Sequence, residues 1–496
     1  MKQLSHNGIL IPKYEPKGFS IAFKGKKINL TTEQEEMAIA WVKKLDTDYA
    51  KDKVFVRNFF DDFCKALGMK GSVEDFDFSE IKELVDKERE SKLAMSSEEK
   101  KKLALERKAI REANKEKYGF AIIDGERVEL GNYMAEPSGI FMGRGKHPLR
   151  GKWKEGAKES DVILNLSPDS KVPAGKWKAI AWQPKSMWIA KWDDRLRGKE
   201  KYIWVSDFSP MKQEREIEKF EKAKELENKF SLIKDHIIKN LDSDDLKKRK
   251  IATVCYLIYA LSMRAGDEKD EDEADTVGAT TLTSKNITIC QNNLVKFNFI
   301  GKDYVKWNKE VVLPENVVRN LKEFIEGSKP FVFDGVRSED VNAFLSEIVE
   351  GITAKVFRTY HASKAVKEYI KNVKVKKDDP ETYKKYLATM ANLQAAIVCN
   401  HKRKLPKKWK ETLEKKKERL EQLKLKKTKK SKEAVKALKM KIKLMKETKD
   451  YNLNTSLKSY VDPRIYYKWA KKVKFDWKKY YSKTLQRKFS WVEKKE

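Results

Sequence analysis

The stretch LVKFNFIGKDYVKWNKEVVL, residues 294–313, predicts a β-hairpin inside an otherwise helical part of the chain. Apolar and polar residues alternate on both sides of Gly301-Lys302-Asp303, and such alternation around a short turn with glycine is typical of two antiparallel strands. The residues around it, from 210 to about 403, carry helical patterns instead. We therefore expect a mainly α-helical domain with a small inserted sheet.

The residues before 210 have a different character. FSIAFKGKKINL, residues 19–30, is β-like, and helical patterns such as EEMAIAWVKKL follow it. The highly charged residues 96–119 predict one long exposed helix. Residues 120–208 carry short strand-like segments and six of the twelve tryptophans, which indicates a compact β-rich module.

A basic segment follows the helical domain. Residues 402–450 hold 22 Lys and Arg against 7 Asp and Glu, a net charge of +15. Leu413 and Leu420 keep a helical spacing in one half, and Val435, Leu438, Ile442 and Met445 do so in the other. This favours an antiparallel helical hairpin, with a disordered charged linker or tail as the alternative.

The composition of the chain indicates its class of partner. Its 496 residues hold 109 Lys and Arg against 76 Asp and Glu, a formal net charge of +33, and such an excess favours a polyanion. Nucleic acid is the leading prediction and an anionic membrane surface the alternative. Because the chain has neither an apolar run of about 18 residues nor a signal peptide, we expect a soluble protein.

Metal and disulfide chemistry are not expected. The four cysteines are scattered without CxxC spacing, so we expect a reduced interior without structural zinc. The acidic run from Asp267 to Asp275 suggests a metal site on composition alone, but a solvated surface loop is the favoured interpretation.

One tyrosine stands in an unusual setting. Tyr460 lies in SLKSYVDPRIYYKWAKK, residues 456–472, three residues before a proline and between lysines and an arginine. A phenol titrates near pH 10, so as a nucleophile it needs cationic neighbours, and a phosphodiester is its natural target beside so much positive charge. Arginines and a histidine would then stabilise the phosphoryl oxygens, and a lysine would protonate the leaving alkoxide.

Candidates exist for each of these functions, and each has a structural alternative. Arg264 follows the apolar pattern IATVCYLIYALSM, where its positive charge can simply be attracted to the negative end of a helix dipole. Arg358 lies in an apolar helical pattern, where a salt bridge is the alternative. Lys302, at the hairpin tip, can be an ordinary exposed lysine, and His401 a helix cap or surface residue.

Six motifs in this order together resemble the eukaryotic-type DNA topoisomerase IB family. They are RAGDEK (264–269), ADTVG (274–278), FIGKDYV (299–305), TAKVFRTYHAS (353–363), CNHKR (399–403) and TSLKSYVDPRI (455–465). The resemblance continues upstream in IPKYEP (11–16), YGFAIID (118–124), GIFMGRGKHP (139–148) and KYIW (201–204), and so covers nearly the whole chain.

The resemblance implies an activity and a site. Tyr460 is implied to be the nucleophile that joins a DNA 3′ phosphate, Arg264, Arg358 and His401 to hold the scissile phosphate, and Lys302 to be the general acid. The implied enzyme relaxes positive and negative supercoils by single-strand cleavage, rotation and religation, without ATP, metal or another cofactor. A tyrosine recombinase and a non-catalytic basic DNA-binding protein are the alternatives.

The resemblance also implies contacts with duplex DNA, mainly to its backbone. The matching positions are Arg144, Trp188, Lys201, Tyr202, Lys219, Ala265, Gly266, Asp267, Glu268, Lys269, Thr276, Thr353, Ala354, Lys355, Val356 and Phe357. Affinity is therefore expected to depend strongly on salt and weakly on sequence.

The implied fold class is an α+β multidomain clamp. Its parts are a mixed N-terminal lobe, a mainly α-helical catalytic domain related to tyrosine recombinases, a coiled-coil linker and a small helical C-terminal domain that carries the tyrosine. The expected boundaries are 1–18 with 100–209 for core subdomain I, 19–99 for the cap, 210–403 for the catalytic subdomain, 404–448 for the linker and 449–496 for the C-terminal domain. A monomer is expected.

The sequence departs from the family pattern at three places. Ser459 and His361 stand where the family commonly has asparagine, and the first of these positions helps to form the site of camptothecin-type poisons. The long charged N-terminal region of nuclear members is missing, because the IPKYEP match begins at residue 11. This favours an archaeal enzyme in the cytoplasm at the nucleoid, with a nuclear eukaryotic enzyme or a viral one as the alternative.

Overall fold

The protein is a mixed α/β chain that divides into two compact units. The computed structural model describes residues 1–267, 276–327, 330–426 and 428–494. The described residues of the first unit are 1–212, and the remainder belong to the second. No helix in these ranges is long and apolar enough to cross a membrane.

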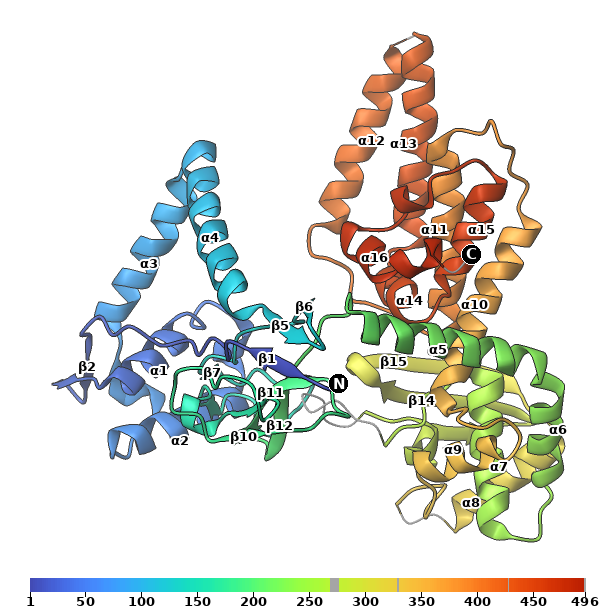
Figure 1. The fold of residues 1–496 in the computed structure, drawn as a ribbon, viewed down its shortest axis with the longest axis horizontal. Coiled ribbons are helices and arrows are strands. Elements are labelled where there is room, and N and C mark those ends of the chain that lie inside the picture. Colours follow the sequence, from blue (N-terminus) through green and yellow to red (C-terminus); the bar gives the residue numbers. More distant parts are fainter. Residues whose placement is uncertain (268–275, 328–329, 427, 495–496) are drawn as a thin grey trace. The chain divides into compact units, whose positions relative to one another are not determined.

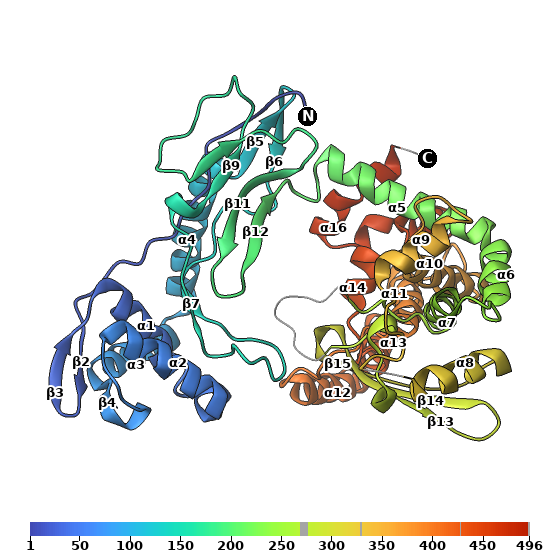
Figure 2. The ribbon, with the colours of Figure 1, turned by 90° about the horizontal axis from the view of Figure 1, so that it is seen from below.

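The first unit combines small sheets with helices. Its elements are β1 Leu4–His6, β2 Ser20–Phe23, β3 Lys26–Asn29, α1 Thr32–Val42, α2 Lys53–Leu67, β4 Phe76–Asp77, α3 Ser79–Ala94, α4 Ser97–Tyr118, β5 Phe120–Ile123, β6 Glu126–Glu129, β7 Gly139–Ile140, β8 Trp153–Lys154, β9 Ile163–Asn165, β10 Ala179–Ala181, β11 Trp188–Asp194 and β12 Lys199–Trp204. The main sheet has the order β10-β9-β11-β12, and Figure 2 shows β9, β11 and β12 side by side. The β-rich module expected over residues 120–208 is thus confirmed.

Residues 19–94 surround a second, aromatic-rich core. The β-like stretch forms strands β2 and β3, which pair antiparallel as Ser20↔Asn29 through Phe23↔Lys26, as expected. Helices α1 and α2 supply large buried side chains, among them Trp41, whose ring stacks 5.0 Å from that of Phe59.

The long charged helix predicted for residues 96–119 is confirmed as α4. It begins with a capping box in which the Ser96 hydroxyl accepts from the Glu99 N–H and the Glu99 carboxylate accepts from the Ser96 N–H. None of its residues is buried, so charged side chains on all faces keep it in solvent. Figure 1 shows α3 and α4 meeting at their connected ends and spreading apart from there.

The second unit is mainly helical. Its elements are α5 Pro210–Asn228, α6 Phe230–Asn240, α7 Leu246–Leu261, β13 Ile287–Ile289, β14 Leu294–Gly301, β15 Val305–Val312, α8 Glu315–Glu326, α9 Ser338–Ser346, α10 Ala354–Asn372, α11 Glu381–Val398, α12 Trp409–Leu425, α13 Lys429–Glu447, α14 Leu453–Ser459, α15 Pro463–Lys472 and α16 Lys483–Lys488. The α5 helix starts in the last residues of the first unit.

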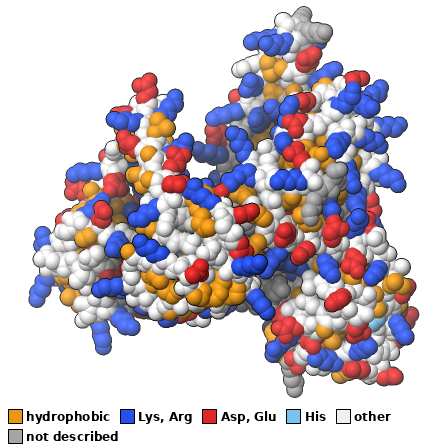
Figure 3. All heavy atoms as spheres, viewed as in Figure 1, with side chains coloured by type: hydrophobic (Ala, Val, Ile, Leu, Met, Phe, Trp, Pro, Cys, Tyr) orange, Lys and Arg blue, Asp and Glu red, His pale blue; other side chains and the backbone are white. Residues whose placement is uncertain are grey.

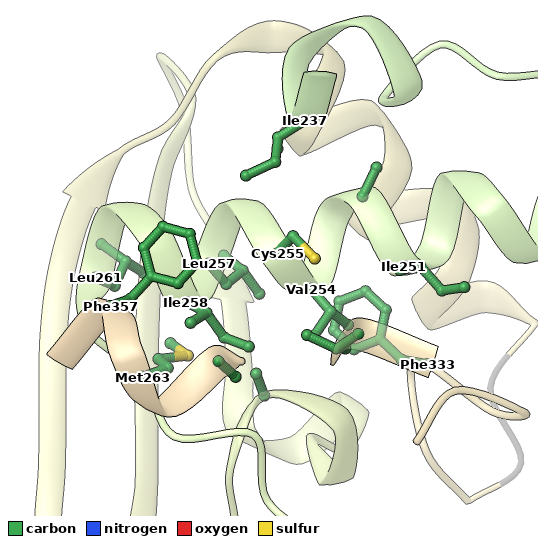
Figure 4. Close-up of a cluster of buried hydrophobic side chains, with 14 of the residues drawn as sticks. Ile237, Ile251, Val254, Cys255, Leu257, Ile258, Leu261, Met263, Phe333 and Phe357 are labelled. Carbon is green, nitrogen blue, oxygen red and sulfur yellow. The ribbon is translucent and has the colours of Figure 1, made fainter. Parts of the chain in front are cut away.

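Helix α7 lies at the centre of the larger core of this unit. Its apolar side chains, including Val254, Cys255 and Ile258, are almost fully buried, and Phe333 and Phe357 pack around them (Figure 4). Burying such a side chain stabilises the fold by about 1.5–3 kcal/mol, so this helix is a fixed support for the residues that follow it.

The predicted hairpin is confirmed, with its turn one residue later than expected. Strands β14 and β15 pair antiparallel over eight residue pairs, from Leu294↔Val312 to Gly301↔Val305. Gly301 is thus part of the ladder, and the turn is Lys302–Tyr304, with Tyr304 at φ 57°. The residue with left-handed backbone is therefore the tyrosine and not the glycine.

The basic segment folds as two helices that pack against each other, α12 and α13. Leu413, Leu438 and Ile442 form the buried contact between them, as the heptad spacing predicted. Figure 3 shows Lys and Arg side chains gathered over this hairpin. The segment is therefore helical from Trp409 to Leu425 and from Lys429 to Glu447.

The last fifty residues do not form a core of their own. Side chains of α14 to α16, such as Tyr466, Trp469 and Phe489, share one hydrophobic cluster with Val366 of α10 and Leu387 of α11. Tyr460 belongs to this cluster, so its position is fixed by packing against α10 and α11.

Candidate active site

Tyr460 lies between two helices of the C-terminal segment. It follows the last residue of α14, and its N–H donates to the Ser456 carbonyl at 2.9 Å. Asp462 then caps α15, whose first residue is Pro463, which suits a first helical position because it has no N–H to satisfy. The sequence thus forces a break directly after Tyr460, and its side chain is 6% exposed.

The guanidinium of Arg358 lies against the ring of Tyr460, 5.3 Å from the ring centre to Cζ. Arg358 is on α10 and is 4% exposed. Its Nη1 donates to the Ser262 carbonyl and its Nη2 to the Cys399 carbonyl, both at 2.7 Å. Within the described chain these partners are main-chain oxygens and not a carboxylate, which disfavours the simple salt bridge considered above.

His401 completes the group. Its ring centre is 5.1 Å from that of Tyr460, its Nε2 is 3.3 Å from Nη2 of Arg358, and its Nδ1 is 2.8 Å from the Ser456 hydroxyl. An arginine only donates, so Nε2 must accept, and the proton of the neutral ring is on Nδ1. The Nδ1–H therefore donates to the Ser456 oxygen.

The charge state of His401 follows from its surroundings. Burial is the largest cause that lowers the pKa of His401, and together with the positive charges of Arg358 and Arg264 it brings this pKa to about 3. The imidazole is thus neutral at physiological pH. It is not the exposed residue of the structural alternative, because it is 7% exposed. Its main-chain N–H does donate to the Ala396 carbonyl in the last turn of α11 at 2.8 Å, while its side chain contacts Arg358 and Ser456.

Arg264 and Lys302 lie on segments joined by main-chain hydrogen bonds. The Ala279 N–H donates to the Arg264 carbonyl at 2.8 Å, and the Val277 N–H donates to the Ile300 carbonyl at 2.7 Å. The described parts of the motifs RAGDEK, ADTVG and FIGKDYV therefore lie next to one another. Arg264 is also close enough to His401 to lower the pKa of the histidine. Both Arg264 and Lys302 are half-buried.

Two glycines allow this meeting. Gly266 has φ 133°, and a Cβ built on it lies 2.9 Å from Cα of Gly278. A side chain at either position forces the two strands of backbone apart, so both glycines are needed for the approach of RAGD to DTVG.

The asparagine after the long helix α11 ties this region to the hairpin. Asn400 Nδ2 donates to the Lys306 carbonyl on β15 at 3.4 Å. Strand β15 is thus joined, four residues after Lys302, to the residue before His401. The structure therefore gathers four of the five predicted catalytic residues around one locality and attaches the fifth, Lys302, to it through the main chain.

The other residues predicted to contact DNA are in varied settings. In the second unit Lys355 and Asp267 are exposed, and Ala265, Gly266, Lys219 and Thr353 are half-buried. Thr276, Ala354, Val356 and Phe357 are buried, the last in the α7 core. Glu268 and Lys269 lie outside the described residues, as does most of the acidic run.

The four candidates of the first unit differ in exposure. Arg144 is exposed, while Lys201 and Tyr202 are half-buried on β12. Trp188 is 3% exposed, and its Nε1 donates to Gln183. Its indole is thus part of the core of the unit.

Sequence reasoning missed several members of the site. The carbonyls of Ser262 and Cys399 have no signal in the sequence, because their contacts with Arg358 span 96 and 41 residues. Ser456 was missed as well, since its contact with His401 spans 55 residues. Ser456 offered one local indication, since it lies four residues before Tyr460 on a helix.

Metal ligation finds no support in the described residues. No group of three or more His, Cys, Asp or Glu side chains there gathers as a metal site. The four cysteines are free thiols, and burial raises the pKa of Cys255 and Cys399, which keeps both protonated.

Comparison with protein families matches three models along the chain. Residues 1–205 match the eukaryotic DNA topoisomerase I DNA binding fragment, residues 208–435 the eukaryotic DNA topoisomerase I catalytic core, and residues 432–496 the C-terminal topoisomerase domain.

Curated relatives agree with these matches. The chain is 35% identical to DNA topoisomerase 1 beta of Arabidopsis thaliana, 34% to DNA topoisomerase 1 of Drosophila melanogaster and 33% to DNA topoisomerase 1 of Homo sapiens. Each alignment covers 99% of this chain, and 58%, 54% and 70% of the respective relative. The chain thus spans little more than half the length of the first two.

Proposed function

Because the chain belongs to the eukaryotic DNA topoisomerase I family, we propose that it is a type IB DNA topoisomerase. It relaxes positive and negative supercoils by cutting one strand, letting it rotate and resealing it. The observation that carries the proposal is the contact of Tyr460 with Arg358 and His401, which come from three segments far apart in the sequence.

A buried donor without a partner supports phosphate binding at this place. Nε of Arg358 is buried and meets no acceptor in the described chain. Such a group is rare in folded proteins and needs an explanation. A phosphate oxygen of DNA is a suitable acceptor, since hydrogen bonds from guanidinium to phosphate are among the strongest in proteins.

In the proposed chemistry, one phosphoester bond forms for each one that breaks. The Tyr460 oxygen attacks the phosphorus and loses its proton to solvent, and the bond from phosphorus to the 5′ oxygen breaks. Lys302 gives a proton to the leaving 5′ oxygen, while Arg264, Arg358 and His401 stabilise the charge on the non-bridging oxygens. A 3′-phosphotyrosyl ester results, and the free 5′ hydroxyl reverses every step.

This balance explains why no ATP is needed. The tyrosyl ester retains the energy of the broken diester, so religation needs no other source. No atom changes its oxidation state in these steps. We therefore propose that relaxation proceeds with neither ATP nor added metal.

His401 requires a rearrangement when a phosphate enters. Its Nε2 accepts from Arg358 in this structure, so it has no proton to donate there. An anionic phosphate attracts the guanidinium and favours a proton on Nε2, with Nδ1 then accepting from the Ser456 hydroxyl. Ser456 suits both states because a hydroxyl both donates and accepts.

The domain plan and the partner are part of the proposal. We propose duplex DNA as partner, bound as a clamp by a monomer with the boundaries expected above, including 404–448 as linker and a catalytic domain related to tyrosine recombinases. The relatives named above are eukaryotic, which favours a nuclear location over the archaeal nucleoid.

The test is plasmid relaxation in EDTA without ATP, on a plasmid lacking any defined recombination site. Wild type should relax it and form a covalent 3′-linked adduct in a denaturing gel. Tyr460→Phe should bind DNA but form no adduct, whereas Tyr467→Phe, on the neighbouring α15, should retain activity. An adduct with Tyr460→Phe refutes the assignment, and activity only at defined sites indicates a recombinase.

A further inference from the structure

Two lysines hold the main chain directly in front of Tyr460. Lys488 on α16 donates from Nζ to the Lys458 carbonyl at 3.2 Å, and Lys219 on α5 donates from Nζ to the Ser459 carbonyl at 3.0 Å. These carbonyls end α14, where the last carbonyls of a helix lack helical partners and carry its negative dipole end. The two positively charged ammonium groups thus suit this negative end of α14.

One carboxylate connects the two lysines. Oε1 of Glu216, also on α5, lies 3.4 Å from Nζ of Lys488 and contacts Nζ of Lys219 as well. The three side chains are only 10 to 25% exposed. Between two ammonium groups that repel each other, the shared negative charge keeps both in place.

The protonation of Lys219 depends on this carboxylate. Burial lowers the pKa of Lys219, the charge of Glu216 opposes that shift, and the charge of Lys488 adds to it. Removing the negative charge therefore favours the neutral amine, which is a weaker donor to the Ser459 carbonyl.

The main chain is also held after Tyr460. The Ser363 hydroxyl of α10 donates to the Tyr460 carbonyl at 3.2 Å and accepts from the Asp462 N–H at 3.1 Å. Carbonyls 458, 459 and 460 are thus each bound by a side chain from a different helix. A bond network of this density fixes the backbone from which the phenol projects.

We infer that Glu216, Lys219 and Lys488 are positioning residues that set the nucleophile through its main chain. The two lysines contact the carbonyls before Tyr460, and Glu216 holds the two lysines. All three therefore act on where the phenol oxygen lies and not on its chemistry. The inference rests on the proposed function. It also gives Lys219 a role other than the DNA contact that the family resemblance implied.

Glu216→Gln is the decisive variant, because it keeps the shape and removes the charge. Single-turnover cleavage and religation should both slow by about tenfold or more, since small errors in the placement of a reacting group reduce rates steeply. DNA affinity should not weaken, because a negative charge is lost. The alkaline limit of the cleavage rate should move to lower pH, since Lys219 loses its proton more readily.

Three further variants separate positioning from folding. Glu218→Gln, exposed on the same helix, should leave both rate constants unchanged. Lys488→Met should slow both steps, and Lys488→Arg should restore them, because a guanidinium can still donate to the Lys458 carbonyl.

The outcomes are distinct. If wild type forms no covalent adduct, the proposed function fails. If wild type does, and Glu216→Gln cleaves and religates at wild-type rates, the positioning role is overturned. A smaller reactive fraction at unchanged rate constants also overturns it, since that result reflects lost folded protein.

Discussion

Ser456→Ala tests how the site fixes its histidine. The Ser456 oxygen accepts the Nδ1–H of His401 at 2.8 Å, and Ser456 is fully buried. The alanine leaves this N–H without an acceptor. Without bound DNA the proton cannot move to Nε2 instead, because Nη2 of Arg358 already donates to that nitrogen.

The magnitude follows from the unpaired donor. A buried donor left without a partner costs about 1–3 kcal/mol, and the loss of one hydroxyl leaves almost no cavity to add to it. We expect the denaturant midpoint of the second unit to fall accordingly. We also expect cleavage to slow by about tenfold, because the imidazole loses the contact that orients it.

The assay combines chemical denaturation with single-turnover cleavage. Asn454→Ala, exposed on the same helix, is the matched control and should change neither. If Ser456→Ala unfolds at the wild-type midpoint and cleaves at the wild-type rate, the tautomer and the orienting role deduced here are wrong.

Three more outcomes are expected. Lys302→Ala should cleave the normal diester about 10²-fold more slowly than wild type, but should approach the wild-type rate when sulfur replaces the 5′ oxygen, because a thiolate leaves without a general acid. Arg264→Ala should cleave both substrates slowly. If sulfur does not rescue Lys302→Ala, another residue is the general acid. A chain without residues 404–448, supplied with 449–496 separately, should cleave at low salt yet bind more weakly as salt rises, and loss of low-salt cleavage by the folded pieces would contradict a peripheral linker. Burial lowers the pKa of His6 to about 4 from an unfolded value of 6.5, so the stability that its neutral form contributes is complete above about pH 6.5 and declines toward pH 4. Between pH 7 and 5 the free energy of unfolding, measured by thermal unfolding, should fall by about 2 kcal/mol in wild type but not in His6→Gln. An equal fall in the variant would contradict this prediction.

Local patterns predicted the elements that local physics determines. The alternation around Gly301 gave the hairpin, since side chains alternate between the faces of any strand, and the charge of residues 96–119 gave a helix that nothing covers. The turn was placed one residue early because a glycine suggested it, whereas pairing of Gly301 with Val305 extends the ladder past the glycine.

The site could be predicted only in part. Ordered motifs predicted five catalytic residues, but no local pattern indicates that Arg358 bonds the carbonyls of Ser262 and Cys399. Equally, nothing before Tyr460 in the sequence indicates that Glu216, some 240 residues earlier, bears on its backbone. Such contacts arise from the packing of α5, α10 and α16, which only the folded chain displays.

Arg358 makes two kinds of contact in this structure, and a simple substitution removes both at once. Its guanidinium joins the end of α7 to the end of α11 through two carbonyls, and it also lies against Tyr460, the proposed nucleophile. Arg358→Ala removes a buried charge and leaves both carbonyls unpaired, so it lowers stability as well as cleavage. Arg264 is half-buried, so Arg264→Ala should lower cleavage with less loss of stability. The transition-state stabilisation proposed for Arg358 is therefore tested by the cleavage rate constant of the folded fraction, and not by total activity.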